Sequence, residues 1–357
     1  MKKIVFFPYH PDLELLVKVQ RFDNIKVTGI CSYQEDRTII KPLNCLLGCE
    51  NQREEDLIEN CDSIVFLENY RNYKFDKYYY LLDKALRLKK EIYILEGLSE
   101  QLDLDQYSGK YRFLKKEPDF TESDIARLNT RNIKYMLETP VLAVTGMGKN
   151  CCKFETQVSL WNVLKEQGYH TVWISSNPLA TFYGGYTMPS FLFSPVLSFE
   201  KKILQFNHFI FGLERKEHPD LFLIGIPEGV TGFETYEYNH FAEYPLVIGN
   251  AVSVDAAILC TYFMKVGNEA GIYNMTQFCR NRFDFPIEEI WVGRNFFEED
   301  RPHRQISYSY LDENYLKKHF AQDVQTAIPI IPVWEKEIVY QAAGSMIQKL
   351  KKNVNAI

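Results

Sequence analysis

An apolar run, a glycine-containing loop and an amphipathic segment follow one another in Val141-Leu142-Ala143-Val144-Thr145-Gly146-Met147-Gly148-Lys149-Asn150-Cys151-Cys152-Lys153-Phe154-Glu155-Thr156. The run Val141–Val144 predicts a buried strand. Apolar residues four, seven and ten positions after Phe154 predict a helix over Lys153–Gln167, which Gly168 ends. Such a loop directs its amides and the positive end of the helix dipole toward one point. The stretch therefore favours binding of an anion such as phosphate.

The loop departs from the standard phosphate-loop pattern GxxxxGK[ST]. Cys152 stands where that pattern has its second glycine, and Phe154 stands at the Ser/Thr position. A longer loop fits better, because five residues separate Gly146 from Cys152 and Lys153. A cysteine here adds a Cβ where the backbone approaches phosphate, which predicts local strain. The lysine is kept, whereas the hydroxyl that normally holds Mg²⁺ is missing.

Further strand patterns follow the loop helix and indicate parallel pairing, because buried strands alternate with helical segments. The predicted strands are Thr171–Ile174, Leu221–Ile226, Pro245–Ile248, Ala256–Cys260 and Ile328–Val333, and a last helix is predicted over Glu335–Lys351. Residues 121–357 are thus predicted to form a P-loop NTPase-like parallel-sheet domain. Residues 121–140 are its connecting helix, which is expected to run to about Leu137.

Residues 1–120 show the same alternation and predict a smaller, Rossmann-like α/β domain. The predicted strands are Lys3–Phe7, Ile25–Cys31, Asp62–Leu67 and Glu91–Leu95, and the predicted helices are Asp12–Gln20 and Tyr78–Leu88. The first strand is followed by Pro8-Tyr9-His10-Pro11-Asp12 and not by a glycine-rich turn. The dinucleotide-binding fingerprint is therefore missing, and NAD binding is not predicted.

The loop resembles that of dethiobiotin synthetase and its relatives, which place five residues between the first glycine and the GK pair. The run Lys153-Phe154-Glu155-Thr156-Gln157 is similar to the GKFTxQ run of a bacterial family related to the D-glutamate N-acetyltransferases. Three other stretches resemble that family: Ile174–Pro178, Phe182–Pro189 and Glu96–Ser99. The resemblance implies a Rossmann-like domain joined to a P-loop domain.

A second resemblance lies at the N-terminus. The stretches Lys3–Tyr9, Leu16–Lys18 and Val27–Ser32 look like those of peptide-maturation-system proteins, which are encoded beside ribosomally made peptide precursors and radical enzymes. In element order the resemblance covers most of residues 1–260. It implies a precursor peptide or a peptide-modifying enzyme as partner.

The chemistry of the loop and the resemblance together predict a site for ATP and Mg²⁺. Lys153 and Glu228 are the expected catalytic residues. Glu228 follows a predicted strand, and in the synthetase-like families a Glu-Gly pair at this point lies beside metal and substrate; an exposed turn glutamate is the alternative. Thr156 and Glu228 are the expected metal ligands. The expected cofactor-binding residues are Gly146, Met147, Gly148, Lys149, Asn150, Cys151, Cys152, Lys153, Phe154, Glu155 and Asn177.

Asn177 is included because ligands bind at the carboxyl ends of parallel strands, although a turn before Pro178 explains it equally well. The adjacent cysteines Cys151 and Cys152 lie at a helix N-terminus beside lysines, which predicts a lowered thiol pKa. No histidine nearby completes a Cys–His pair, so cysteine catalysis is not expected. The chain's eight cysteines form no CxxC pair and are expected to be reduced thiols.

The 357 residues carry a net charge of -6, which does not favour nucleic acid or an anionic membrane as partner. No secretory signal or apolar run of about 18 residues is recognised, and a cytoplasmic location is expected. Three functions remain open: an ATP-linked accessory protein in peptide maturation, a non-catalytic scaffold with a vestigial P-loop, and an acyl-CoA-dependent N-acyltransferase-like enzyme. A homodimer is one arrangement open to such a domain.

Overall fold

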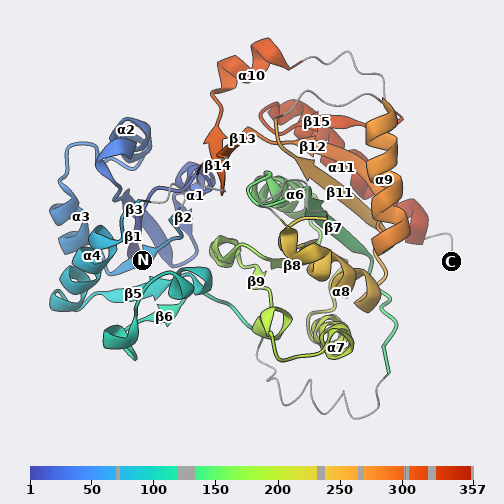
Figure 1. Cartoon of the computed structure of the whole chain (residues 1–357), viewed down its shortest axis with the longest axis horizontal. Helices are drawn as coiled ribbons and strands as arrows, with labels where there is room; N and C mark the ends of the chain where they lie inside the picture. The colour runs from blue at the N-terminus through green and yellow to red at the C-terminus, as the bar shows by residue number, and fades with distance from the viewer. Residues whose placement is uncertain are drawn as a thin grey trace. The chain divides into compact units, whose positions relative to one another are not determined.

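The computed structural model describes residues 1–69, 73–118, 133–230, 238–263, 269–300, 302, 305–320 and 327–354. The chain divides into two compact units, which are Met1–Lys116 with Thr181–Tyr183, and Glu117–Ala180 with Gly184–Ile357. Each unit is built on a mainly parallel sheet with helices between its strands (Figure 1). This confirms the predicted α/β class, with a Rossmann-like part and a P-loop NTPase-like part.

The first unit holds a six-stranded sheet in the order β2-β3-β1-β4-β5-β6, in which only β2 and β3 pair antiparallel. Its strands are β1 (Lys2–Phe7), β2 (Arg21–Phe22), β3 (Ile25–Ile30), β4 (Ser63–Phe66), β5 (Glu91–Ile94) and β6 (Arg112–Phe113). Its helices are α1 (Leu13–Val19), α2 (Arg37–Leu46), α3 (Glu54–Asn60) and α4 (Asp76–Arg87). The strands and helices predicted here are confirmed to within two residues at each end.

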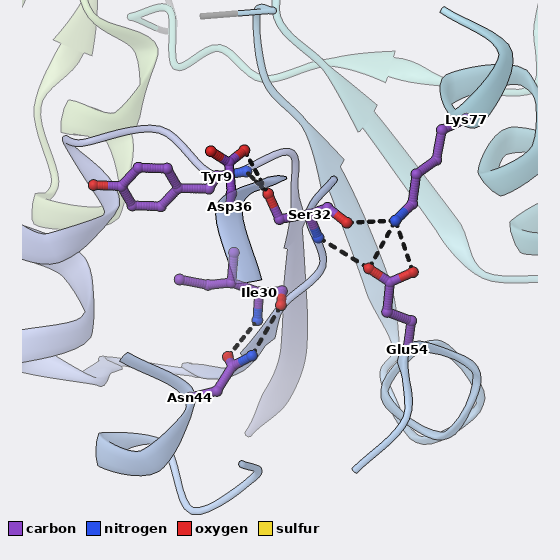
Figure 2. A network of polar contacts seen from close by, with 7 residues as sticks. All are labelled: Tyr9, Ile30, Ser32, Asp36, Asn44, Glu54 and Lys77. Atoms are coloured by element: carbon purple, nitrogen blue, oxygen red, sulfur yellow. Dashed lines mark hydrogen bonds and ion pairs between the residues drawn. The ribbon is translucent and has the colours of Figure 1, made fainter. Parts of the chain in front are cut away.

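A network of hydrogen bonds surrounds Ser32, which follows β3 at the carboxyl edge of this sheet (Figure 2). Its N–H donates to Oε1 of Glu54 at 3.1 Å, and its carbonyl accepts from Nζ of Lys77. The Ser32 hydroxyl donates to Oδ2 of Asp36 at 3.0 Å and accepts from the Tyr9 N–H at 3.4 Å. One buried serine thus joins the segment after β1 to the first turns of α3 and α4.

The second unit holds a seven-stranded sheet in the order β15-β12-β11-β7-β10-β8-β9, and every recorded pair in it is parallel. The strands are β7 (Val141–Gly146), β8 (Thr171–Ser175), β9 (Tyr186–Thr187), β10 (Leu221–Gly225), β11 (Ala256–Thr261), β12 (Ile287–Val292) and β15 (Ile330–Pro332). The central strand β7 lies between β10 and β11. After β7 the chain first forms the strands on one side of it (β8, β9 and β10) and then those on the other side (β11, β12 and β15). The loop after β7 therefore lies at a topological switch point, where ligands bind in such sheets.

Helices cover this sheet on two faces. The main ones are α6 (Lys153–Glu166), α7 (Phe199–Glu217), α8 (Glu243–Ala251), α9 (Glu269–Phe283) and α11 (Lys336–Val354). Apolar side chains of α7, α8 and α9 share one core with Val141 and Ala143 of β7. Because alternate residues of a strand face opposite sides, Leu142 and Val144 face the other layer, where α6 packs with α11.

The predicted strand Pro245–Ile248 is wrong, because these residues lie in helix α8. A short apolar run has the same signature in a buried strand and in a buried helix. Pro245 is compatible with the helix because it occupies the first turn, where its missing N–H has no intrahelical partner to lose.

Residues 121–132 of the predicted connecting helix lie outside the described residues. The part that is described, 133–139, is not helical, so the helix does not extend through Leu137. Instead, the Asn207 side chain of α7 accepts from the Tyr135 N–H at 2.7 Å and donates to the Tyr135 carbonyl at 2.9 Å. Oε1 of Glu214 accepts the N–H groups of Glu138 and Thr139. Side chains of α7 therefore replace the hydrogen bonds that a helix would make.

An antiparallel hairpin that the sequence patterns did not predict follows β12. Its strands are β13 (Asn295–Asp300) and β14 (Gln305–Tyr310), and α10 (Glu313–His319) comes next. The 3₁₀ segment η5 (Pro178–Tyr183) follows β8, and its last three residues belong to the first unit. The 3₁₀ segments η6 (Ser190–Phe193) and η7 (Asn239–Ala242) follow β9 and precede α8, respectively. Within the described residues, no helix has the length and apolar character needed to cross a membrane.

Candidate phosphate-binding loop

The loop between β7 and α6 adopts a backbone that suits an anion. Asn150 and Cys152 both have left-handed backbone angles, with φ of 53° and 60°. Left-handed residues in such a turn bring successive N–H groups to one side, which forms an anion-binding concavity. Cys152 is also the N-cap of α6, and its side chain makes no capping hydrogen bond. The first turn of this 14-residue helix therefore opens onto the loop without a side-chain cap from that position.

Five consecutive carbonyl groups of the loop are held by donors. Each carbonyl from Gly146 to Asn150 accepts a hydrogen bond, from one backbone N–H and four side chains in all. In chain order the donors are the Val230 N–H, Nδ2 of Asn239, Nζ of Lys153, the Tyr262 hydroxyl and Nδ2 of Asn295. In a trans peptide the carbonyl and the following N–H point in opposite directions. The N–H groups that follow these carbonyls are therefore turned away from the five donors.

Lys153 spans the loop. Its ammonium donates to the Gly148 carbonyl at 2.7 Å and to the Glu228 carbonyl. A Cβ at Gly146 would collide with Sγ of Cys151 and would lie 3.1 Å from Cδ of Lys153. Glycine at 146 is therefore required by the close approach of the lysine stem and the buried thiol. The ammonium therefore lies between the loop and the segment after β10.

Cys152 keeps its side chain out of the loop. A Cβ at Gly293 would lie 2.8 Å from Cβ of Cys152, and Sγ of Cys152 lies 3.7 Å from the Trp291 carbonyl. The side chain thus points toward the end of β12, where the glycine leaves room for it. A left-handed residue with a Cβ is disfavoured by about 1–2 kcal/mol. The predicted strain is present in the backbone, but the added Cβ does not fill the loop.

Burial raises the pKa of both loop cysteines. For Cys151, burial outweighs the opposing charge of Lys153, and for Cys152 burial and the neighbouring Cys260 thiol act in the same direction. The prediction of lowered thiol pKa values is therefore wrong. The helix N-terminus and the lysines stabilise a thiolate, but loss of hydration has the larger effect on a buried sulfur.

Glu228 lies directly beside the loop. Its Oε2 is 3.4 Å from Nζ of Lys149, and its Oε1 is 4.0 Å from Nε2 of His240. Its backbone is left-handed, with φ of 55°, and its side chain is 18% exposed. The next residue, Gly229, packs so tightly that a Cβ would collide with the Met147 carbonyl. The structure thus brings one carboxylate and two lysines, Lys149 and Lys153, to the same loop.

Three expected side chains face elsewhere. Thr156 is fully buried, and its hydroxyl accepts from Sγ of Cys260 at 3.3 Å. The Phe154 ring stacks on Trp173 with a centroid separation of 6.0 Å. Oδ1 of Asn177 accepts the Leu179 N–H at 3.0 Å, as expected of a turn residue. Glu155 is half-buried and lies in the first turn of α6.

The structure adds four residues that the sequence patterns did not identify: Asn239, Tyr262, Gly293 and Asn295. Three of them hold loop carbonyls, and they lie 92, 113 and 145 residues from the groups that they bind. No local motif marks them. The only signal was position, because Tyr262 directly follows β11, which flanks β7, and Gly293 directly follows β12, the next strand of the sheet.

Among the residues that the structure describes, no three His, Cys, Asp or Glu side chains form a group able to hold a metal ion. The Glu228 carboxylate lies 3.4 Å from the Lys149 ammonium. Mg²⁺ is commonly held by one or two carboxylates together with substrate phosphates and water. A single carboxylate at this loop therefore fits a metal that arrives with a nucleotide better than a metal held by protein alone.

No family model and no curated protein matches the sequence. Among solved structures, a DUF1611 family protein from Anabaena variabilis matches with a TM-score of 0.57 at 13% identity, over 97% of this chain and 100% of that chain. Cobyrinic acid a,c-diamide synthase from Mycobacterium smegmatis, solved with ADP and magnesium, matches at 13% identity over 60% of this chain and 96% of its own, with a TM-score of 0.35. HypB from Helicobacter pylori, solved with nickel, matches at 8% identity over 65% and 94%, with a TM-score of 0.32.

The last two scores are too low to carry an argument. The first match has low identity and therefore bears on the fold alone. It extends over almost the whole chain, so the two-unit α/β fold described above is shared with the DUF1611 protein.

Proposed function

We propose that the loop Gly146–Lys153 binds the phosphates of a nucleotide, with ATP and Mg²⁺ as the ligand. The observation that carries this proposal is that five consecutive carbonyls, Gly146 to Asn150, accept hydrogen bonds from five separate donors. Each N–H that follows one of these carbonyls points away from that carbonyl's donor, and we propose that a phosphate accepts from the N–H groups of Gly148 to Cys151. The Met147 N–H is not among them, because it donates to the Cys260 carbonyl at 3.0 Å.

Lys153 would supply charge to the phosphate by turning away from its present partners. Its ammonium now meets two neutral carbonyls, at Gly148 and Glu228. Exchange of these partners for phosphate oxygens replaces neutral acceptors by charged ones, and such hydrogen bonds are roughly twice as strong. Lys149 lies beside Glu228 and adds a second positive charge near the loop. Mg²⁺ bound with ATP would neutralise phosphate charge, and Glu228 is the carboxylate that would face it.

Binding is better supported than turnover. P-loop enzymes hold Mg²⁺ with a hydroxyl in the first turn of the loop helix. Here that position is Phe154, whose ring is in the core, and the Thr156 hydroxyl is buried against Cys260. We therefore propose slow or absent hydrolysis, with Lys153 and Glu228 as the residues on which any turnover depends.

The biological context that we propose is maturation of a ribosomally made peptide, with a precursor peptide or a peptide-modifying enzyme as partner. Only the sequence resemblance of the N-terminal stretches supports this context. The buried Thr156 hydroxyl favours a second candidate within it, a scaffold that has kept the P-loop architecture without catalysis. Pull-down with a precursor peptide that persists in Lys153→Ala and needs no nucleotide would select the scaffold.

Isothermal titration of ATP and ADP, each with and without Mg²⁺, tests the phosphate site. Lys153→Ala removes charge-assisted hydrogen bonds worth about 1.5–3 kcal/mol, so affinity should fall by at least roughly tenfold. Lys349→Ala is the matched control, because this lysine of the same unit pairs at the surface with Glu288 at 2.9 Å. Absence of wild-type binding at millimolar nucleotide, or equal binding by Lys153→Ala, would overturn the proposal. Preference for acetyl-CoA over ATP would select the acyltransferase-like alternative.

A further inference from the structure

The carbonyls of Lys149 and Asn150 depend on two residues that lie outside any phosphate-loop motif. The Tyr262 hydroxyl donates to the Lys149 carbonyl, and Nδ2 of Asn295 donates to the Asn150 carbonyl. We propose that Tyr262 and Asn295 are positioning residues for phosphate binding, and that they couple the β13–β14 hairpin to the occupancy of the loop. This inference rests on the proposed function and extends it to regulation of the same site.

Tyr262 contacts both the loop and the hairpin, the loop through its hydroxyl and the hairpin through its ring. It follows β11 and is 1% exposed. Its ring packs edge-on against Phe297 of β13 at a centroid distance of 5.0 Å and stacks on Tyr308 of β14 at 6.0 Å. The hydroxyl at the far end of the ring reaches the loop carbonyl. Movement of the hairpin aromatics would therefore displace a donor that fixes the peptide between Lys149 and Asn150.

Asn295 makes the second connection from the hairpin backbone itself. It is the first residue of β13, is 7% exposed, and its own carbonyl accepts from the Phe263 N–H at 2.7 Å. Its side chain holds the carbonyl of Asn150, a residue with left-handed φ. A peptide at such a strained position keeps its orientation only when its surroundings determine it.

The hairpin is suited to respond to the loop. Its six residue pairs run from Asn295 opposite Tyr310 to Asp300 opposite Gln305, and within the described residues these two strands form a sheet by themselves. A two-stranded hairpin is marginally stable in water unless it packs on other elements. Its order therefore depends on contacts such as those with Tyr262 and with the guanidinium of Arg294, which lies 4.0 Å from the Tyr310 ring centroid.

Coupling between the two elements is reciprocal by thermodynamic necessity. A phosphate that accepts from the Asn150 and Cys151 amides requires the preceding carbonyls to stay turned toward Tyr262 and Asn295. Phosphate binding would thus stabilise both hydrogen bonds and the hairpin that supplies them. Conversely, a hairpin held in place by these contacts raises the fraction of protein whose loop is ready to bind.

Two variants and one matched control test this inference. Tyr262→Phe removes the hydroxyl and keeps the ring, and Asn295→Ala removes the second donor. The control is Tyr78→Phe, because Tyr78 is also fully buried and its hydroxyl donates to a backbone carbonyl, that of Leu67, at 2.8 Å in the first unit. From the usual net value of a hydrogen bond, each test variant should bind ATP or ADP roughly two- to tenfold more weakly, whereas Tyr78→Phe should bind as the wild type does.

Amide hydrogen exchange measured by mass spectrometry tests the coupling between the loop and the hairpin directly. ADP with Mg²⁺ should slow amide exchange in residues 296–299 and 306–309 of the wild type, and this protection should shrink in Tyr262→Phe. In ligand-free protein, the same variant should speed exchange of residues 149–151. Wild-type binding that leaves hairpin exchange unchanged, or wild-type-like affinity and exchange in Tyr262→Phe, would overturn the inference. Failure of the proposed function looks different, since the wild type would then bind no nucleotide while the ligand-free comparison still tests positioning.

Discussion

The space beside Cys152 exists because residue 293 is glycine: a Cβ at Gly293 would lie 2.8 Å from Cβ and 3.1 Å from Sγ of Cys152. The loop thus has a cysteine where phosphate loops have glycine, and the end of β12 has the glycine that accommodates it. A side chain at 293 would press on the N-cap of α6, which is also the last residue of the loop before Lys153.

Gly293→Ala should therefore weaken nucleotide binding. Overpacking of a close contact commonly costs about 1–3 kcal/mol, and part of that strain would fall on the loop, so we expect affinity to drop about tenfold. Cys152→Gly should restore binding in the double variant. Titration calorimetry on the two single variants and the double variant checks this, with Gly344→Ala as control because nothing lies within 4 Å of a Cβ there. Undiminished binding by Gly293→Ala, or no recovery in the double variant, would contradict the relationship.

Glu228 should make nucleotide affinity depend on Mg²⁺. Its carboxylate lies 3.4 Å from the Lys149 ammonium and close to the proposed phosphates. Without metal it repels phosphate, so Glu228→Gln should bind Mg²⁺-free ATP more tightly than the wild type, by roughly three- to tenfold. With Mg²⁺ the variant should bind more weakly than the wild type. Glu288→Gln, on the surface of the same unit, serves as control. Identical Mg²⁺ dependence of nucleotide affinity in Glu228→Gln and wild type would show that Glu228 does not contribute to the site.

Glu289 should make stability depend on pH. Burial raises its pKa from 4.5 to about 6, although the Trp291 indole donates to its Oε2 at 2.8 Å and Lys349 also favours the charged form. Because the folded-state pKa is the higher one, this carboxyl reduces stability as pH rises from about 4.5 through about 6. One pKa unit corresponds to about 1.4 kcal/mol, so the reduction at neutral pH is about 2 kcal/mol.

Glu289→Gln should consequently stabilise the protein by about 2 kcal/mol at pH 7.5 and by little at pH 4.5. Urea denaturation at the two pH values measures this difference. Glu288→Gln offers the comparison, since Glu288 is partly exposed and pairs with Lys349. A gain for Glu289→Gln that is equal at both pH values would show that charge burial is not its cause.

Asn207 should contribute to the stability of the second unit through the segment that enters β7. Its side chain makes two hydrogen bonds to the Tyr135 backbone and one to the Ala251 carbonyl at 2.9 Å. Asn207→Ala leaves buried groups unsatisfied, so the free energy of unfolding should fall by about 1–3 kcal/mol. Asn250→Ala, which removes an exposed bond to the Leu246 carbonyl, should change it much less. Equal losses of unfolding free energy in the two variants would show that the Tyr135 contacts contribute no more than an exposed hydrogen bond.

The sequence by itself determined the elements whose signals are local. Hydrophobic periodicity predicted β7, helix α6 and the alternating pattern of the first unit, because a residue's face in a strand or helix follows from its spacing. Loop length and the position of Lys153 placed a candidate phosphate site between β7 and α6 for the same reason. Where the local signal was ambiguous, as in the apolar run Pro245–Ile248, the prediction was wrong, since only packing decides between a buried strand and a buried helix.

Only the tertiary structure decided what surrounds the loop. The donors to the Met147, Lys149 and Asn150 carbonyls come from Asn239, Tyr262 and Asn295, at separations of 92 to 145 residues, which no local pattern encodes. Burial likewise reversed the expected pKa shift of Cys151 and Cys152. The fold also buries the Thr156 hydroxyl against the Cys260 thiol. Hydration and long-range hydrogen bonds depend on which segments meet in space. The sequence therefore determined the loop's chemical type, and the fold decided which way its peptide groups point.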